Sequence, residues 1–315
     1  MCGIVGYLGK GNAQESLIDG LRRLEYRGYD SAGVAFHEGG EFSLSRETGR
    51  VENLANALRG SGSSSSLGIA HTRWATHGSV TVSNTHPHQS HDGKFVLVHN
   101  GVIENYGTLK RFLEGKGMSF ASETDSEVLC NLIAYHYSEL PEDEDRFIDA
   151  VRLALPKCRG AYGIAVLCLD YPDVMIGARR GSPLVVGLGE DANFIASDAS
   201  AFVGRAKEAV FLNDGELAIL DKGGFRITTL EGQDAQAVTH PLDQILEEVE
   251  LGDFDSYMEK EIYEQPAALE NTLRGRFGDD GTTAKLGGLE GHEDMLRSLD
   301  RIIFVACGTA RHACM

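Results

Sequence analysis

The sequence begins Met1-Cys2-Gly3-Ile4-Val5-Gly6 (MCGIVG), and the interpretation of the whole chain depends on this stretch. A cysteine follows the initiator methionine, and a short apolar segment follows the cysteine. Because cysteine is small, removal of Met1 would leave a chain that starts with a thiol and a free α-amine on one residue. A thiolate is a strong nucleophile, and an amine with a pKa near ~8 is able to activate it. The stretch therefore predicts either a nucleophile beside a buried strand or an ordinary cysteine at position two.

Bulk composition places the chain among globular proteins. Its 315 residues suffice for two domains, and 42% of them are hydrophobic. No apolar run reaches the length of a membrane span, and no basic segment followed by an apolar one marks a secretory signal. The six cysteines are scattered without a CxxC pair, which favours reduced thiols in the cytoplasm over disulfides or a zinc site.

The formal net charge of −18 indicates which partners to expect. A uniformly acidic protein repels phosphates, so nucleic acid is not an expected partner. The scarcity of lysine and the spread of acidic residues resemble a salt-adapted proteome, but ordinary acidity gives the same pattern. A gain in stability at molar salt would separate the two interpretations.

The first 240 residues alternate between strand and helix patterns. Helical spacing of apolar residues predicts helices over Gln14–Glu25, Asn105–Leu113 and Asp145–Leu155. Ser122 and Asp125 have the spacing of a capping box for a further helix. Short apolar segments predict strands over Gly3–Leu8, Val34–Phe36, Leu67–His71, Phe95–Val98, Tyr162–Leu169, Val174–Ala178, Leu184–Leu188, Phe194–Ala196 and Glu216–Leu220. Many strands with few helices predict an α+β domain of packed sheets with helices outside, over residues 1–240.

The composition changes after this domain. Residues 241–298 are acidic and predict a helical linker, with one helix over Ser256–Thr272 and a Gly/Asp-rich connection over 277–290. Ile302–Ala306 then reads as a buried strand that ends at Cys307-Gly308-Thr309. A strand followed by a Gly-Thr turn is typical of the start of a parallel α/β domain with a phosphate or sugar site. Residues 299–315 are too few to bury a core, so this second domain is predicted to be truncated.

Polar residues of functional interest lie where predicted strands end or helices begin, which is where sites are built. Each also has an ordinary interpretation as a surface charge, a satisfied histidine, a turn or a helix cap. His86 and His88 lie close together, but no third ligand has metal-site spacing. The residues are Arg27, Arg73, Trp74, His77, His86, Asn100, Gly101 and Asp125.

Ten segments together resemble the glutamine-hydrolysing half of the glutamine–fructose-6-phosphate aminotransferase family. MCGI and HNG alone would fit any amidotransferase with an N-terminal cysteine, whereas EYRGYDSAG, TRWATHG and KEIYEQP point to this family. The segments are Met1–Gly6, Leu24–Gly33, Ile69–Gly78, Val98–Asn105, Ser122–Glu127, Arg159–Gly163, Gly181–Val185, Phe194–Asp198, Glu259–Pro266 and Ala306–Thr309.

The resemblance implies a four-layer αββα fold of the N-terminal-nucleophile hydrolase type. It also implies that Cys2 attacks the side-chain amide of glutamine to give a thioester and ammonia, with its own α-amine carrying the proton. Asn100 and Gly101 would form the oxyanion hole, where a missing donor commonly costs ~3 kcal/mol. The mechanism calls for no cofactor and no metal.

The family pattern also assigns residues that bind the substrate. Arg73 matches the residue that holds the α-carboxylate of glutamine, and Asp125 matches the partner of its α-ammonium group. Opposite charges at these two places would select a free amino acid over a peptide-bound glutamine. Further matching positions are Thr76 and His77, which contact glutamine, Trp74 and Tyr29, which relate to loop closure and ammonia passage, and Arg27, His86 and His99.

In the complete family, ammonia passes to a sugar-isomerase module that converts fructose 6-phosphate to glucosamine 6-phosphate, and the enzyme is expected to be a cytoplasmic homodimer. Thr309 matches a sugar-phosphate-binding position, while Ala310 departs from the serine usual there. The remaining isomerase residues are absent, so this chain is expected to hydrolyse glutamine only. Two alternatives remain open: an amidotransferase of purine or asparagine synthesis, and a non-catalytic module that binds partner subunits.

Overall fold

The computed structural model describes residues 2–60, 63–75, 78–242, 254–273, 276, 284, 291–305 and 308–315. The chain divides into two compact units, residues 1–249 and 250–315. None of the helices in the described ranges is long and apolar enough to cross a membrane.

The first unit contains two antiparallel sheets. The larger has the strand order β14-β11-β9-β10-β1-β4-β2-β3, so the strand after Cys2 lies inside the sheet. Its strands are β1 Gly3–Gly9, β2 Ser31–Glu38, β3 Glu41–Thr48, β4 Leu67–Arg73, β9 Val185–Leu188, β10 Ala192–Ala196, β11 Glu208–Phe211 and β14 Thr239–Pro241. The smaller has the order β13-β12-β8-β7-β6-β5, with β5 His88–Gln89, β6 Phe95–Ile103, β7 Gly160–Cys168, β8 Met175–Arg180, β12 Glu216–Asp221 and β13 Gly224–Thr229.

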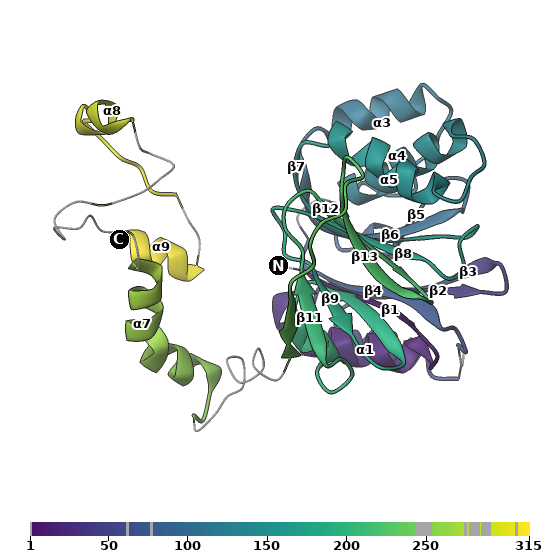
Figure 1. Cartoon of the computed structure of the whole chain (residues 1–315), viewed down its shortest axis with the longest axis horizontal. Helices are drawn as coiled ribbons and strands as arrows, with labels where there is room; N and C mark the ends of the chain where they lie inside the picture. Colours follow the sequence, from purple (N-terminus) through teal and green to yellow (C-terminus); the bar gives the residue numbers. More distant parts are fainter. Residues whose placement is uncertain are drawn as a thin grey trace. The chain divides into compact units, whose positions relative to one another are not determined.

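Helices cover the outer faces of the two sheets (Figure 1). Helices α1 (Ala13–Leu24) and α2 (Val51–Ala57) pack on the larger sheet. Helices α3 (Tyr106–Glu114), α4 (Asp125–Glu139) and α5 (Arg146–Ala154) pack on the smaller sheet. A third apolar cluster lies between the sheets. The layers are therefore helix, sheet, sheet and helix, which confirms the predicted α+β architecture with helices outside.

In the first unit, one predicted helix start differs from the structure. The hairpin between β2 and β3 turns at Gly39 and Gly40, whose φ values of 58° and 86° suit glycine. The predicted capping box of Ser122 and Asp125 is wrong. The helix cap lies two residues later, where the Thr124 side chain accepts from the Glu127 N–H. The Glu127 carboxylate turns back to accept from the backbone N–H groups of residues 121 and 122.

The second unit contains helices α7 (Tyr257–Leu273), α8 (Glu293–Arg297) and α9 (Gly308–Cys314). The predicted strand over Ile302–Ala306 is wrong for residues 302–305, which form no strand and are 64–90% exposed. A strand needs a neighbouring strand to pair with its backbone, and residues 302–305 form no such pairing. The predicted 277–290 connection lies outside the described residues, apart from residue 284.

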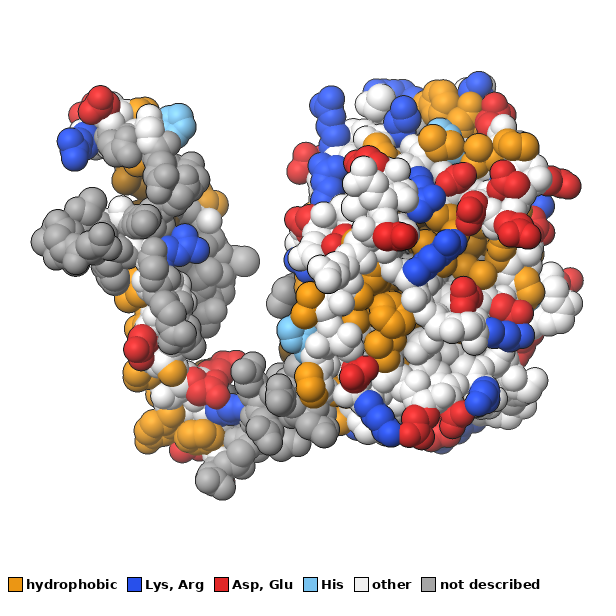
Figure 2. Space-filling model, in the orientation of Figure 1, with side chains coloured by type: hydrophobic (Ala, Val, Ile, Leu, Met, Phe, Trp, Pro, Cys, Tyr) orange, Lys and Arg blue, Asp and Glu red, His pale blue; other side chains and the backbone are white. Residues whose placement is uncertain are grey.

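The surface of the first unit carries both signs of charge. On the face shown in Figure 2, acidic and basic side chains are interspersed rather than gathered into one patch of a single sign. Ion pairs between exposed side chains, such as Lys10 with Asp191 and Arg22 with Glu52, occur at 3.0 Å and 2.9 Å. The full sequence has an excess of acidic residues, with a net charge of −18. Whether this reflects salt adaptation stays a prediction.

Candidate active site

The candidate site continues the apolar layer between the two sheets. Successive residues of a strand point to opposite faces, so residues two apart share a face. In β4, Leu67 and Ile69 belong to the cluster between the sheets, and His71 and Arg73 follow them on the same face. In β1, Ile4 belongs to the same cluster, and Cys2 precedes it by two residues. The apolar rows of the larger sheet therefore end in a thiol, an imidazole and a guanidinium group.

The smaller sheet contributes a matching row from β6. Val96 and Val98 belong to the cluster between the sheets, and Asn100 follows them on that face. His99 lies on the opposite face, where its Nδ1 is 2.9 Å from the Ser126 hydroxyl of α4. A cavity of about 310 Å³ lies where these rows end. Its size is that of a small-molecule site.

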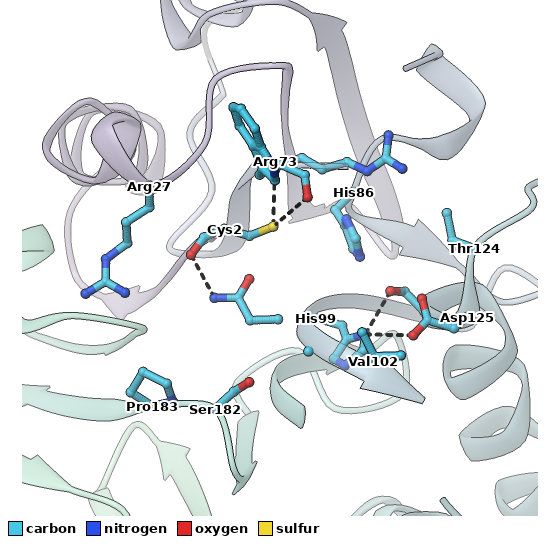
Figure 3. Close-up of a pocket in the computed structure, with 14 residues that line it drawn as sticks. Cys2, Arg27, Arg73, His86, His99, Val102, Thr124, Asp125, Ser182 and Pro183 are labelled. Atoms are coloured by element: carbon cyan, nitrogen blue, oxygen red, sulfur yellow. Dashed lines mark hydrogen bonds and ion pairs between the residues drawn. The ribbon is translucent and has the colours of Figure 1, made fainter. Parts of the chain in front are cut away.

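Cys2 lies in this cavity with its sulfur held by the backbone of Trp74. The Trp74 N–H donates to Sγ at 3.1 Å, and Sγ lies 3.5 Å from the Trp74 carbonyl (Figure 3). Burial raises the pKa of the Cys2 thiol above that of an ordinary cysteine, against the lowering effect of the Trp74 N–H. The group is therefore a thiol at neutral pH, and a base is needed to form the thiolate.

Asn100 and Gly101 lie beside Cys2. The Asn100 Nδ2 donates to the Cys2 carbonyl oxygen at 3.0 Å, and its Oδ1 lies 3.0 Å from the His71 Nε2. Gly101 has a φ of 130°, and a Cβ atom there would lie 2.1 Å from the Ala161 carbonyl oxygen. Only glycine fits this backbone. Asn100 and Gly101 thus present an amide and a tightly fixed backbone to the cavity.

Two buried side chains of opposite charge also line the cavity. The Arg73 guanidinium donates to the carbonyls of Ser79 and Gly78 at 3.3 Å and 3.4 Å. Asp125 is the first residue of α4, and its Oδ2 accepts from the Ile103 N–H at 2.7 Å. Arg73 and Asp125 are each 3% exposed. In Figure 3 they come from different sides of the space into which the Cys2 sulfur points.

The sequence of this chain is similar to those of known glutamine amidotransferases. Residues 44–140 match the family model described as a glutamine amidotransferase domain. The chain is 46% identical over 99% of its length to glutamine–fructose-6-phosphate aminotransferase (isomerizing) of Thermus thermophilus, and 44% identical over 99% to that of Chlorobaculum tepidum. It spans about half the length of these relatives, 50% and 51% respectively.

The chain therefore contains a glutamine amidotransferase domain. Among solved structures, it is similar to glutamine phosphoribosylpyrophosphate amidotransferase of B. subtilis, with a TM-score of 0.62 and 26% identity. That match covers 73% of this chain and 49% of the other. The recognition made from the ten sequence segments is confirmed by these relatives.

Not all of the other predicted site residues point toward the Cys2 sulfur. Arg27 lines the cavity, but its guanidinium forms an ion pair with Asp198 and lies 3.0 Å from the Tyr26 hydroxyl. In Figure 3 it points away from the Cys2 sulfur. Trp74 is 47% exposed and contacts the ring of Tyr29 edge-on at 5.4 Å. Thr76 and His77 lie outside the described residues, and so does the side chain of Thr309.

A group of buried histidines lies beside the cavity, with His86 of this group in the cavity lining. The sequence had indicated only part of the group. The rings of His71 and His86 are 4.1 Å apart, and those of His86 and His88 are 4.6 Å apart. Burial lowers the pKa of His71 to about 3, and those of His86 and His88 well below 6.5. All three are therefore neutral near pH 7. Within the described ranges, no group of His, Cys, Asp or Glu is arranged to hold a metal ion.

His71 was missed, although it touches Asn100 directly. The signal was present in the alternation Leu67, Ile69, His71, Arg73, in which a histidine continues an apolar row toward a charged residue. An apolar row that ends in polar residues indicates that a core face opens into a site.

Proposed function

We propose that this chain hydrolyses L-glutamine to L-glutamate and ammonia, with Cys2 as the nucleophile. The observation that carries this proposal is the meeting of four groups in one cavity: the Cys2 thiol, the Asn100 amide, the Arg73 guanidinium and the Asp125 carboxylate. A nucleophile with neutral donors suits acyl transfer, and paired charges suit a zwitterionic amino acid. The fold would be that of the N-terminal-nucleophile hydrolases.

The proposed reaction has two steps. After removal of Met1, the α-amine of Cys2 takes the thiol proton, and the thiolate attacks the side-chain carbonyl carbon of glutamine. The proton then passes to the leaving nitrogen, the C–N bond breaks, and ammonia departs from a thioester. Water attacks the thioester carbonyl in the second step, which releases glutamate and restores the thiol. Because burial raises the pKa of the Cys2 thiol, this internal base is a necessary part of the proposal.

The oxyanion of each tetrahedral intermediate would be held by two neutral donors, the Asn100 side chain and the Gly101 N–H. Such donors act strongly because they are fixed before the charge develops. The backbone contact between residues 101 and 161 and the Asn100 bond to the Cys2 carbonyl supply that fixation. Neutral donors also avoid binding an anion in the resting site.

The substrate's two charged groups would be bound from different sheets. Arg73, at the end of β4, is proposed to bind the α-carboxylate, for which a guanidinium has the matching planar geometry. Asp125, at the start of α4, is proposed to bind the α-ammonium group. Thr76, His77, Trp74 and His86 are proposed as further substrate contacts. Arg27 would act beside the site, through its pair with Asp198.

The sugar reaction belongs to the proposal for the complete protein. The relatives are named for glutamine and fructose 6-phosphate, and this chain spans half their length. We propose that the full-length enzyme is a homodimer that uses the ammonia to convert fructose 6-phosphate to glucosamine 6-phosphate, with residues 299–315 opening the isomerase module. A role in purine synthesis is less well supported, because the sequence identity to the solved amidotransferases of that kind is only 26–27%.

The test combines N-terminal mass analysis with a glutamate-release assay. The active protein should lack Met1, and Cys2→Ala should lower hydrolysis by at least about 10⁴-fold, as expected when a nucleophile is removed. Cys314→Ala is the matched control, because Cys314 is exposed in the second unit. Active protein that retains Met1, or hydrolysis that survives Cys2→Ala, would refute the mechanism.

A further inference from the structure

His71 occupies an unusual place in the site. It is 1% exposed, and its Nε2 lies 3.0 Å from the Asn100 Oδ1. It pairs across the sheet with Ile4, two residues from the nucleophile. The side chain is therefore held by a strand inside the larger sheet and reaches across to the smaller sheet. This contact links the two sheets at the point where the oxyanion is proposed to form.

The Asn100 amide has two different ends, and the reaction needs only one of them. Its NH₂ group carries two donor hydrogens, while its oxygen only accepts. One hydrogen goes to the Cys2 carbonyl, which leaves the second for a ligand in the cavity. If the amide were turned over, its oxygen would face the Cys2 carbonyl and the developing oxyanion, and both contacts would be repulsive.

The partner of the oxygen decides which way the amide lies. Because the Asn100 Oδ1 accepts, the His71 Nε2 must carry a hydrogen. Burial keeps His71 neutral, so the proton on Nε2 defines its tautomer. An imidazole with a bare Nε2 would instead attract the NH₂ group and turn the amide over.

We propose that His71 is a positioning residue that fixes the Asn100 amide with its N–H groups toward the Cys2 side, so that the amide stabilises an oxyanion. This inference rests on the proposed function. It gives His71 no contact with glutamine, and its effect passes entirely through Asn100. A loss at His71 therefore lowers the rate of acyl transfer without weakening substrate binding.

Two reactions of Cys2 separate positioning from general damage. Glutamine hydrolysis passes through an oxyanion, whereas alkylation by iodoacetamide displaces iodide from carbon without forming one. His71→Leu should lower kcat for hydrolysis by about 10- to 100-fold, with KM and the alkylation rate within about twofold. His71→Gln, whose amide nitrogen reaches the place of Nε2, should recover at least about tenfold of that loss, and it also serves as the test if His71→Leu does not fold.

His88→Leu is the matched control. His88 is buried in the same histidine group and bonds to the Thr124 hydroxyl, but it does not touch Asn100. Any loss it causes should affect hydrolysis and alkylation equally. His71→Leu combined with Asn100→Ala should be no slower than Asn100→Ala alone, because both remove the same interaction.

The outcomes that oppose the inference are distinct. If the wild-type chain is active and His71→Leu keeps its kcat, or if the losses at positions 71 and 100 multiply, the positioning role is wrong while the proposed function stands. Equal losses with His71→Leu and His71→Gln in folded protein would also refute it. A wild-type chain that reacts with iodoacetamide but hydrolyses no glutamine would overturn the proposed function itself, and the positioning role with it.

Discussion

The two walls of the cavity carry different chemistry. The wall from the larger sheet holds the proposed nucleophile Cys2 and the cationic Arg73, and the neutral His71 of the same sheet lies beside this wall, against Asn100. The wall from the smaller sheet and α4 holds the amide of Asn100 and the anionic Asp125. A free amino acid bound by both charges would bridge the two sheets. Substitutions on the two walls are therefore expected to affect different kinetic constants.

Among substitutions on the two walls, the largest loss of activity is expected at Asn100 of the smaller sheet. Asn100→Ala should lower kcat for glutamine hydrolysis by about 10²- to 10³-fold, because an oxyanion donor is lost. KM should change little, since the amide contacts no charged group of the substrate. Steady-state kinetics measure both constants. Asn105→Ala, which removes a half-buried amide at the start of α3 that does not line the cavity, is the control. Equal changes in KM would show that Asn100 binds the ground state.

The charged pair tests whether the substrate bridges the walls. Arg73→Lys and Asp125→Asn should each raise KM by about 10- to 100-fold, as expected when a hydrogen bond between charged groups is lost. Asparagine at 125 retains an oxygen for the Ile103 N–H, so α4 should keep its start. Arg152→Lys, away from the cavity, is the control. Wild-type KM values for both variants would contradict the bridging arrangement.

A smaller effect, on the pH dependence of stability, should come from the uncharged His71 of the larger sheet. The pKa of His71 is lowered to about 3 in the folded chain, whereas an unfolded histidine titrates near ~6.5. The unfolded state thus binds more protons between these values. This contribution to stability is complete above pH ~6.5 and is lost as pH falls toward 3, by about 1.4 kcal/mol per pH unit. Urea unfolding between pH 7 and 4 should show a shallower pH dependence for His71→Leu. An unchanged slope would mean that His71 is protonated in the folded chain.

The smallest effect is expected from removal of the second unit. Every described residue that lines the cavity belongs to residues 1–249. A chain ending at residue 249 should therefore hydrolyse glutamine within about twofold of the full chain, as an independent domain would. A glutamate-release assay on both chains measures this. A tenfold loss would show that the two walls depend on residues 250–315.

The sequence predicted local structure well and distant contacts poorly. Helix α1 was expected over Gln14–Glu25 and spans Ala13–Leu24, because its apolar spacing is regular. The capping box was misplaced because Thr124 with Glu127 has the same spacing as Ser122 with Asp125. The strand predicted near residue 302 failed because pairing partners cannot be deduced from an apolar run.

The site was predicted mainly by resemblance rather than by pattern. The contact between Asn100 and the Cys2 carbonyl joins residues 98 positions apart, and no local periodicity predicts it. His71 was missed for a different reason. It lies in a segment that the resemblance included, but the family pattern assigned roles there only to Arg73 and the loop that follows it. The alternation that reveals it requires knowing which face of β4 meets the second sheet.

The apolar core between the two sheets continues directly into the cavity, so residues that pack the core are close neighbours of residues in the proposed site. Ile69 and Val98 are each two residues from a side chain of the proposed oxyanion site, His71 and Asn100 respectively. Interiors are close-packed, so deleting a methyl group there leaves a cavity toward which the neighbouring strands relax only in part. The apolar layer thus acts as a spacer that sets the gap between nucleophile and amide. Reaction rate should respond to such changes before the melting temperature does, which makes turnover a sensitive gauge of core packing.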